Sequence, residues 1–184
     1  VYKRQERNAS EGRQKLIAFI EHLDDSVDKV INSLENNNLL DNTIIIFTSD
    51  NGGALHYSAS NKPFNGGKGN MLEGGIRIPC IVKWSNVIKP GVVNDPIMLM
   101  DFYPTLVNIS REFNDYNLPS KNILPLLKDE ELSYDSRFMV WIRREGHVFG
   151  GRDFYAISNG RFKLLQNSPF EPYELYDLEK EPFE

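Results

Sequence analysis

The sequence predicts an α/β fold followed by a small antiparallel β-sheet, and three observations support this prediction. Apolar residues recur every three or four positions across Gly12–Leu40, as on one face of an amphipathic helix. Thr43–Thr48 is β-branched and apolar on both faces, which is typical of a central strand covered on both sides. Later in the chain, short strands alternate with turn signals. We therefore divide the chain into residues 1–133 and 134–184.

The first helix and strand are followed by a long loop and a second strand. The Asn36–Asn38 run interrupts the helical period. Residues 54–75, which are rich in glycine and asparagine, are expected to form a long loop, and loops of this length inside a compact domain are usually functional or disordered. Ile76–Trp84 then predicts another strand, and Pro79 argues against a fully central position for it because proline lacks a backbone donor.

Two further helices and a meander complete the predicted elements. Asp101 is suited to cap a helix whose first turn holds Pro104, and a short helix is expected at Ile123–Leu127. Asn159-Gly160 is a hairpin signal within the meander. The expected strands of the meander are Phe138–Arg143, Phe154–Ser158, Phe162–Leu165 and Glu174–Leu178.

Length and composition exclude several classes of protein. The chain has 184 residues, of which 40% are hydrophobic and 26% charged, as in ordinary globular proteins. A formal net charge of −5 argues against general nucleic-acid binding. With Cys80 as the one cysteine, neither an internal disulfide nor a cysteine-based zinc cluster can form. Apolar runs such as Ile44–Phe47 are too short to span a bilayer, so we expect no membrane partner.

Two oxygen-bearing side chains, Asp50 and Asn51, directly follow the first predicted strand. Ligands collect at the carboxyl ends of strands in open α/β sheets, and Ca²⁺ and Mg²⁺ prefer oxygen ligands. The pair is therefore a candidate site for a divalent cation. The alternative is a simple turn, because Asp-Asn-Gly is ordinary turn chemistry.

The long loop holds a candidate anion site at Lys68. Glycines on both sides of Lys68 let backbone amides and the ammonium approach an oxyanion closely, although the spacing is not that of a P-loop. The alternative is a solvated lysine in a loop. His56, in the same loop, is a candidate for lining the site or acting as an acid, and a structural role is equally open. Glu73 and Arg77 are expected to form an ion pair that pins the loop to the next strand.

The chain offers no convincing covalent nucleophile. Cys80 lies among apolar residues, which is the setting of an inert buried thiol. No serine lies in a Gly-x-Ser-x-Gly elbow. The residues thus indicate a cation site and an anion site without a nucleophile.

The order and spacing of four motifs resemble the sulfatases of the alkaline-phosphatase superfamily, and the tail through Glu181-Pro182 is also similar. The resemblance implies that residues 1–133 are the C-terminal part of an alkaline-phosphatase-like mixed sheet with helices. It implies that Asp50 and Asn51 bind Ca²⁺, with Mg²⁺ possible, and that Lys68 contacts the sulfate; it assigns no role to His56. The motifs are Asp41-Asn42-Thr43 through Ser49-Asp50-Asn51-Gly52-Gly53, Gly66-Gly67-Lys68-Gly69, Leu72 through Pro79, and Asp101-Phe102-Tyr103-Pro104-Thr105.

The same resemblance implies a sulfuric ester hydrolase of which this chain is the C-terminal half. Such enzymes use a formylglycine nucleophile, made from a Cys-x-Pro-Ser-Arg or Ser-x-Pro-Ser-Arg motif in the N-terminal half, which also supplies an aspartate pair for the metal. Neither motif occurs here. We therefore expect the full-length protein to be a sulfatase, the N-terminal half of the same enzyme to be its partner, and this chain alone to be inactive.

The expected substrate is a sulfated small molecule or carbohydrate, and the resemblance favours an exported location, whether periplasmic, secreted or lysosomal. Two alternatives remain open at this stage. One is a non-catalytic fragment or interaction module of a sulfatase-like protein. The other is a related phosphohydrolase, which is less expected because such relatives usually bind two transition metals through histidines.

Overall fold

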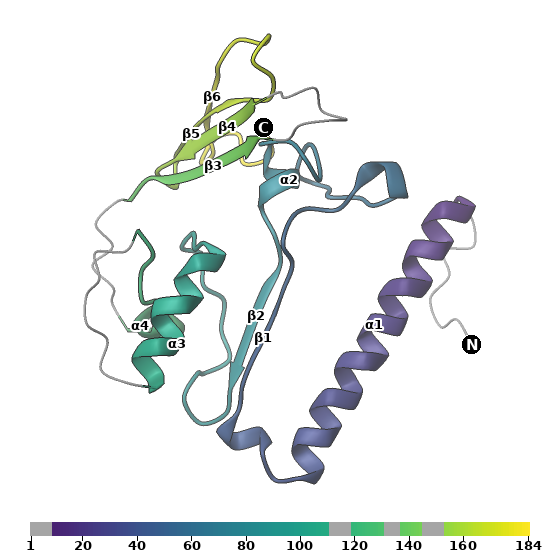
Figure 1. Ribbon diagram of the computed structural model, residues 1–184, viewed down its shortest axis with the longest axis vertical. Helices are drawn as coiled ribbons and strands as arrows, with labels where there is room; N and C mark the ends of the chain where they lie inside the picture. The colour runs from purple at the N-terminus through teal and green to yellow at the C-terminus, as the bar shows by residue number, and fades with distance from the viewer. Residues whose placement is uncertain (1–8, 111–118, 131–136, 145–152) are drawn as a thin grey trace.

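A computed structural model describes residues 9–110, 119–130, 137–144 and 153–184. Figure 1 shows an elongated arrangement in which a long helix, a two-stranded ribbon and a four-stranded sheet occupy different regions. The helices and strands, in chain order, are α1 (Glu11–Asn36), β1 (Ile44–Thr48), α2 (Glu73–Ile76), β2 (Cys80–Trp84), α3 (Phe102–Ser110), α4 (Leu124–Leu127), β3 (Met139–Arg144), β4 (Asp153–Ser158), β5 (Phe162–Gln166) and β6 (Glu174–Asp177).

Helix α1 confirms the predicted amphipathic helix and its end at the asparagine run. Ser10 caps it, since its hydroxyl accepts a hydrogen bond from the backbone nitrogen of Arg13 at 3.3 Å. None of its residues is fully buried, and the side chain of Phe19 is 73% exposed. In Figure 1, α1 lies apart from β1 and β2. Within the ranges described above, no helix combines the length and the apolar character needed to cross a membrane.

Strands β1 and β2 pair antiparallel, with Ile44 opposite Trp84 and Thr48 opposite Cys80. The prediction that β1 is covered on both sides is wrong for the part of the chain that the structure describes, because none of its residues is buried. An apolar strand needs neighbours on both faces, and here one face meets helices while the other exposes Phe47. An apolar groove separates the covered face from α3 and α4; it is lined by Ile44, Ile46, Val82, Trp84, Ile88, Phe102, Thr105, Leu106, Ile109, Leu124 and Leu127.

The second strand is shorter than predicted, and the long loop contains more regular structure than predicted. Residues Glu73–Ile76 form the short helix α2, so the strand begins only at Cys80, after Pro79. The loop also contains a short 3-10 helix at Leu55–Tyr57.

Asp101 joins three segments of the chain. Its fully buried carboxylate accepts hydrogen bonds from the backbone nitrogens of Met98, at 2.7 Å, and Lys121, at 2.9 Å. The guanidinium of Arg137 binds both of its oxygens, with Nη1 at 2.6 Å from Oδ1. Asp101 takes part in capping, as predicted, but from inside the helical segment. It ends a 3-10 turn, Leu99–Asp101, that runs directly into α3, and its carboxylate binds the backbone nitrogen of Met98, which precedes that turn. Pro104 does lie in the first turn of α3, as predicted.

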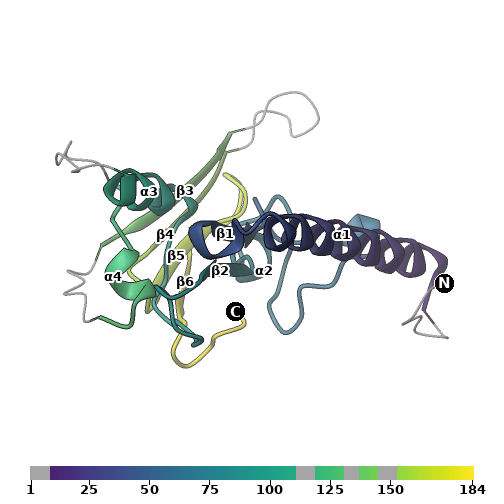
Figure 2. The same ribbon diagram turned by 90° about the horizontal axis from the view of Figure 1, so that it is seen from below.

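Strands β3 to β6 form the predicted antiparallel meander, in the order β3-β4-β5-β6. Asn159-Gly160 lies in the turn between β4 and β5, where Gly160 has φ of +97° and the backbone nitrogen of Asn159 donates to the carbonyl of Phe162 at 3.2 Å. Met71 packs with Ala156 and Leu165 in a small buried core. The segment just before α2 is thus anchored on the sheet (Figures 1 and 2).

We predict that Asp101→Asn lowers the free energy of unfolding by about 3–5 kcal/mol, because it removes the buried negative charge that the guanidinium of Arg137 and two backbone nitrogens bind. Asp24→Asn on the exposed surface of α1 is the matched control and should change the free energy by less than about 0.5 kcal/mol. Urea unfolding measures both. Equal stability of the two variants would show that the bonds of Asp101 do not hold these three segments of the chain together.

Candidate functional site

Three pairs of glycines meet at the carboxyl end of β1, and we call them the glycine junction: Gly52–Gly53, Gly66–Gly67 and Gly74–Gly75. A Cβ atom on Gly52 would lie 1.8 Å from the carbonyl oxygen of Gly74, and one on Gly67 would lie 2.6 Å from that of Gly53. Real Cβ atoms do not approach backbone oxygens so closely, so these positions require glycine. The junction allows three backbone segments to touch without intervening side chains.

Backbone hydrogen bonds complete the junction. The nitrogen of Gly52 donates to the carbonyl of Gly75 at 2.8 Å, and the nitrogen of Lys68 donates to the carbonyl of Gly53 at 3.1 Å. The second bond links the loop of Lys68 directly to the turn that carries Asp50 and Asn51. The structure thus brings the backbones of the predicted anion and cation sites side by side, although 17 positions separate Lys68 from Asn51 in the sequence.

The turn after β1 carries side-chain oxygen atoms that could bind a cation, on Asp50 and Asn51. The carboxylate-bearing Asp50 is exposed. The side-chain nitrogen of Asn51 donates to the carbonyl of Gly52 at 2.9 Å, which leaves Oδ1 as the amide atom that can face a cation. The hydroxyl of Ser49 donates to the carbonyl of Asn51 at 3.0 Å and braces the turn. These residues fit as part of a calcium shell, and its other ligands would have to come from elsewhere, because the described residues contain no cluster of three or more His, Cys, Asp or Glu side chains.

Lys68 and His56 have different surroundings. Lys68 is exposed, so its ammonium is accessible to an anion. His56 lies in the 3-10 helix at Leu55–Tyr57, with its ring centroid 4.2 Å from that of Tyr57. Within the described ranges, no hydrogen bond or ion pair joins His56 to Asp50 or Lys68, so its role in the site stays a prediction.

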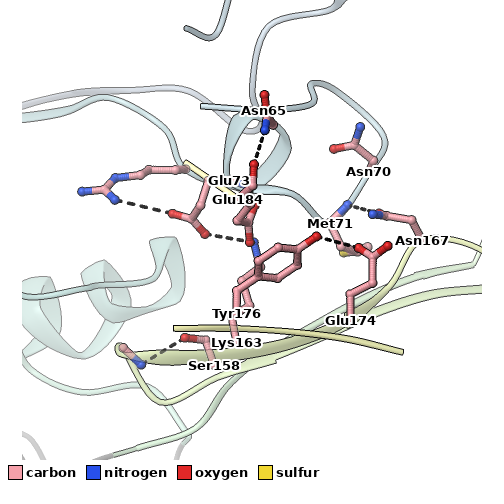
Figure 3. A network of polar contacts seen from close by, with 12 residues as sticks. Asn65, Asn70, Met71, Glu73, Ser158, Lys163, Asn167, Glu174, Tyr176 and Glu184 are labelled. Atoms are coloured by element: carbon pink, nitrogen blue, oxygen red, sulfur yellow. Dashed lines mark hydrogen bonds and ion pairs between the residues drawn. The ribbon is translucent and has the colours of Figure 1, made fainter. Parts of the chain in front are cut away.

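A buried network of charges lies beside the junction (Figure 3). The fully buried ammonium of Lys163, on β5, lies 2.9 Å from a carboxylate oxygen of Glu73 and 2.7 Å from one of Glu184. Glu73 immediately precedes Gly74–Gly75, and it also forms the predicted ion pair with Arg77, at 3.5 Å. Through Lys163, the four-stranded sheet therefore fixes the third segment of the junction.

The surroundings of this network shift the pKa values of Glu184 and Tyr176. Burial raises the pKa of Glu184, while Lys163 opposes that shift. Burial, together with a hydrogen bond to Glu174, raises the pKa of Tyr176 to about 12. The hydroxyl of Tyr176 therefore stays protonated near neutral pH and donates to the carboxylate of Glu174 at 2.8 Å.

Cys80 corrects one prediction from the sequence. Its side chain is exposed, because Cys80 opens β2 opposite Thr48, at the end of the ribbon. The prediction of a buried thiol is therefore wrong. Partial burial nevertheless raises the pKa of the Cys80 thiol, against a weaker opposing effect of the hydrogen bond to Thr48. A raised pKa disfavours the reactive thiolate, as expected for an inert cysteine.

Sequence reasoning missed two residues that organise the site, Asn61 and Lys163. The side chain of Asn61 binds the backbone of the junction. An asparagine in a glycine-rich loop is a usable signal for such a role, because its amide imitates a peptide group. Lys163 gave no such signal, since a lysine on an amphipathic strand is ordinarily exposed.

We predict that Lys163→Met lowers the free energy of unfolding by about 3–5 kcal/mol, because it removes the buried ammonium that pairs with both Glu73 and Glu184. Glu73 would keep its ion pair with Arg77, whereas the buried carboxylate of Glu184 would lose the ammonium 2.7 Å away. Lys180→Met is the matched control, since the side chain of Lys180 is 76% exposed and should contribute less than about 1 kcal/mol. Urea unfolding followed by circular dichroism measures both. A small loss for Lys163→Met would mean that the network does not hold the sheet to the junction.

The sequence matches two family models. The model described as "Sulfatase" matches residues 2–110, and the model described as "N-sulphoglucosamine sulphohydrolase, C-terminal" matches residues 66–184. Among curated proteins, a sulfatase of Formosa agariphila is 33% identical over 88% of this chain and 32% of its own length. Human arylsulfatase H is 37% identical over 65% of this chain and 23% of its own length. The chain thus spans a third or less of these relatives.

Solved structures share the fold. The crystal structure of Ps i-CgsB in complex with k-i-k-neocarrahexaose matches with a TM-score of 0.85 and 27% identity, over 97% of this chain and 39% of that one. A structure in complex with its substrate D-glucosamine-2-N,6-O-disulfate matches with a TM-score of 0.68 and 23% identity, over 90% of this chain and 34% of that one. Together, the two family models and the Formosa relative establish that the chain belongs to the sulfatase family.

Proposed function

We propose that the whole protein hydrolyses sulfate esters and that this chain supplies a cation-binding turn and a sulfate-binding lysine. The observation that carries the proposal is the glycine junction, which joins the loop of Lys68 to the turn of Asp50 and Asn51 by one backbone hydrogen bond of 3.1 Å. Membership of the sulfatase family supports the reaction type.

Asp50 and Asn51 would hold part of a Ca²⁺ site, with Mg²⁺ as the alternative. The carboxylate of Asp50 provides negative charge, and Oδ1 of Asn51 provides a neutral oxygen. A bound cation would supply positive charge next to the oxygens of a sulfate ester. Since calcium takes about six to eight oxygens, the remaining ligands must come from outside this pair.

Lys68 would bind a sulfate oxygen through its ammonium. Negative charge redistributes over the oxygens as the sulfur–oxygen bond breaks, and a fixed ammonium stabilises that charge without reorganising. The backbone of Lys68 is fixed by its bond to Gly53, while its side chain is exposed and able to reach a ligand. The role of Lys68 is therefore to orient the sulfate and to stabilise its charge.

The nucleophile and most of the substrate pocket would lie outside these residues. A formylglycine is the expected nucleophile, and Cys80 is not its precursor, because it follows Pro79 and precedes Ile81. We propose a sulfated carbohydrate as the substrate. Two structural neighbours support this class, since one is bound to a neocarrahexaose and the other to D-glucosamine-2-N,6-O-disulfate.

We predict that Lys68→Ala in the full-length protein lowers kcat/KM for a sulfate ester by roughly tenfold to a hundredfold, since a charge-assisted hydrogen bond contributes on the order of 1.5–3 kcal/mol. Lys68→Arg should recover little activity, because a planar guanidinium does not replace a compact ammonium beside Gly67 and Gly69. Steady-state kinetics on an aryl sulfate measure both variants.

Lys89→Ala, at an exposed loop position, is the matched control and should keep wild-type kinetics. Metal content is measured in every variant, so that a lost cation is not mistaken for a lost sulfate contact. Wild-type kcat/KM in Lys68→Ala would remove Lys68 from the site.

A further inference from the structure

Asn61 binds the glycine junction through both ends of its side-chain amide. Its Oδ1 accepts a hydrogen bond from the backbone nitrogen of Gly53 at 2.7 Å. Its Nδ2 donates to the carbonyl of Gly53 at 2.9 Å and to the carbonyl of Gly66 at 3.0 Å. The amide thus pairs with Gly53 as a neighbouring strand would, and it reaches the next segment of the junction with the same nitrogen.

These three bonds connect the two halves of the proposed site. Gly53 follows the turn of Asp50 and Asn51, and Gly66 precedes Lys68 by two positions. The carbonyl of Gly53 accepts from Asn61 and also from the backbone nitrogen of Lys68. Asn61 therefore lies where the cation-binding turn and the lysine loop are joined, while contributing no charge of its own.

The amide also matches its surroundings closely. A Cβ atom on Gly53 would lie 2.9 Å from Oδ1 of Asn61, and one on Gly67 would lie 2.9 Å from its Nδ2. The side chain thus lies against both glycine segments. A shorter side chain would leave the backbone groups without these partners, and a carboxylate would place an acceptor against two carbonyl oxygens.

We infer that Asn61 is a positioning residue that sets the distance between Lys68 and the turn of Asp50 and Asn51. This role deepens the proposed function and rests on it, because the distance matters only if both groups act on one ligand. Misplacing a binding group by about 1 Å can cost on the order of a hundredfold in rate. Asn61 acts through Lys68, so its loss should matter less once Lys68 is absent.

The first experiment tests the link itself by amide hydrogen exchange in the full-length protein. Asn61→Ala and Asn61→Asp should both speed exchange in the peptides that contain Gly53 and Lys68. The amide of Gly53 loses its hydrogen bond to Asn61, and the amide of Lys68 bonds to a carbonyl that Asn61 no longer holds in place. Exchange in the β4–β5 hairpin should not change. Asn32→Ala is the control, because Asn32 makes a 2.8 Å amide bond to Asp28 on exposed α1. Unchanged exchange at Gly53 and Lys68 would overturn the inference.

The second experiment is a double-mutant cycle on kcat/KM, measured well below the unfolding temperature of every variant. Asn61→Ala should lower kcat/KM at least tenfold in the wild-type background and less than threefold in Lys68→Ala. A purely structural role predicts the same fold-loss in both backgrounds, and that result would contradict positioning through Lys68. A wild-type protein without activity on any sulfate ester would refute the proposed function instead, and hydrogen exchange would still report whether Asn61 joins the two loops.

Discussion

Direct contact between glycine backbones is the constraint on which the site depends. Three separate segments of one stretch of the chain meet at Gly52–Gly53, Gly66–Gly67 and Gly74–Gly75, and even one methyl group would separate them. The closeness of the segments allows the bond from the nitrogen of Lys68 to the carbonyl of Gly53. Glycine is conformationally costly in a folded chain, so other interactions must hold the segments in place.

Two sets of polar contacts hold them. Asn61 satisfies the backbone groups of Gly53 and Gly66. Lys163 pairs with Glu73 and Glu184, and it anchors the segment of Gly74–Gly75 to the four-stranded sheet. Burying an ammonium costs several kcal/mol, which its two carboxylates offset only while the geometry is kept. The sheet and the site are therefore coupled through one buried side chain.

Sequence patterns correctly predicted the features that depend on residues close together in the chain. The period of α1, its end at the asparagine run and the β4–β5 turn at Asn159-Gly160 all appear where the residues indicate them. These features depend on side-chain spacing and turn preference, which a sequence shows directly. The ion pair of Glu73 with Arg77 belongs to the same class, since Glu73 begins the short helix α2 and Arg77 directly follows it, four positions later.

Features that depend on distant partners were predicted poorly. Asp101 suits a helix cap by its residue type, and its carboxylate does bind the backbone nitrogen of Met98. Its bonds to Arg137 and to the backbone of Lys121 do not follow from that residue type. The apolar character of β1 predicts covering on both faces, whereas the described residues cover one. The motifs identified Asp50, Asn51 and Lys68 as candidates, but neither the junction that joins their loops nor the part played by Asn61 follows from spacing alone.

The central claim is that the glycine junction sets the geometry of the site, and Gly52→Ala tests it most directly. Its Cβ would collide with the carbonyl of Gly74, whereas a Cβ on Gly91 meets no atom closer than 4.0 Å, so Gly91→Ala is the matched control. In the full-length protein, with folding checked by circular dichroism, Gly52→Ala should lower both calcium affinity and kcat/KM at least tenfold, and Gly91→Ala should change neither. Wild-type values of both quantities in a folded Gly52→Ala variant would contradict the account.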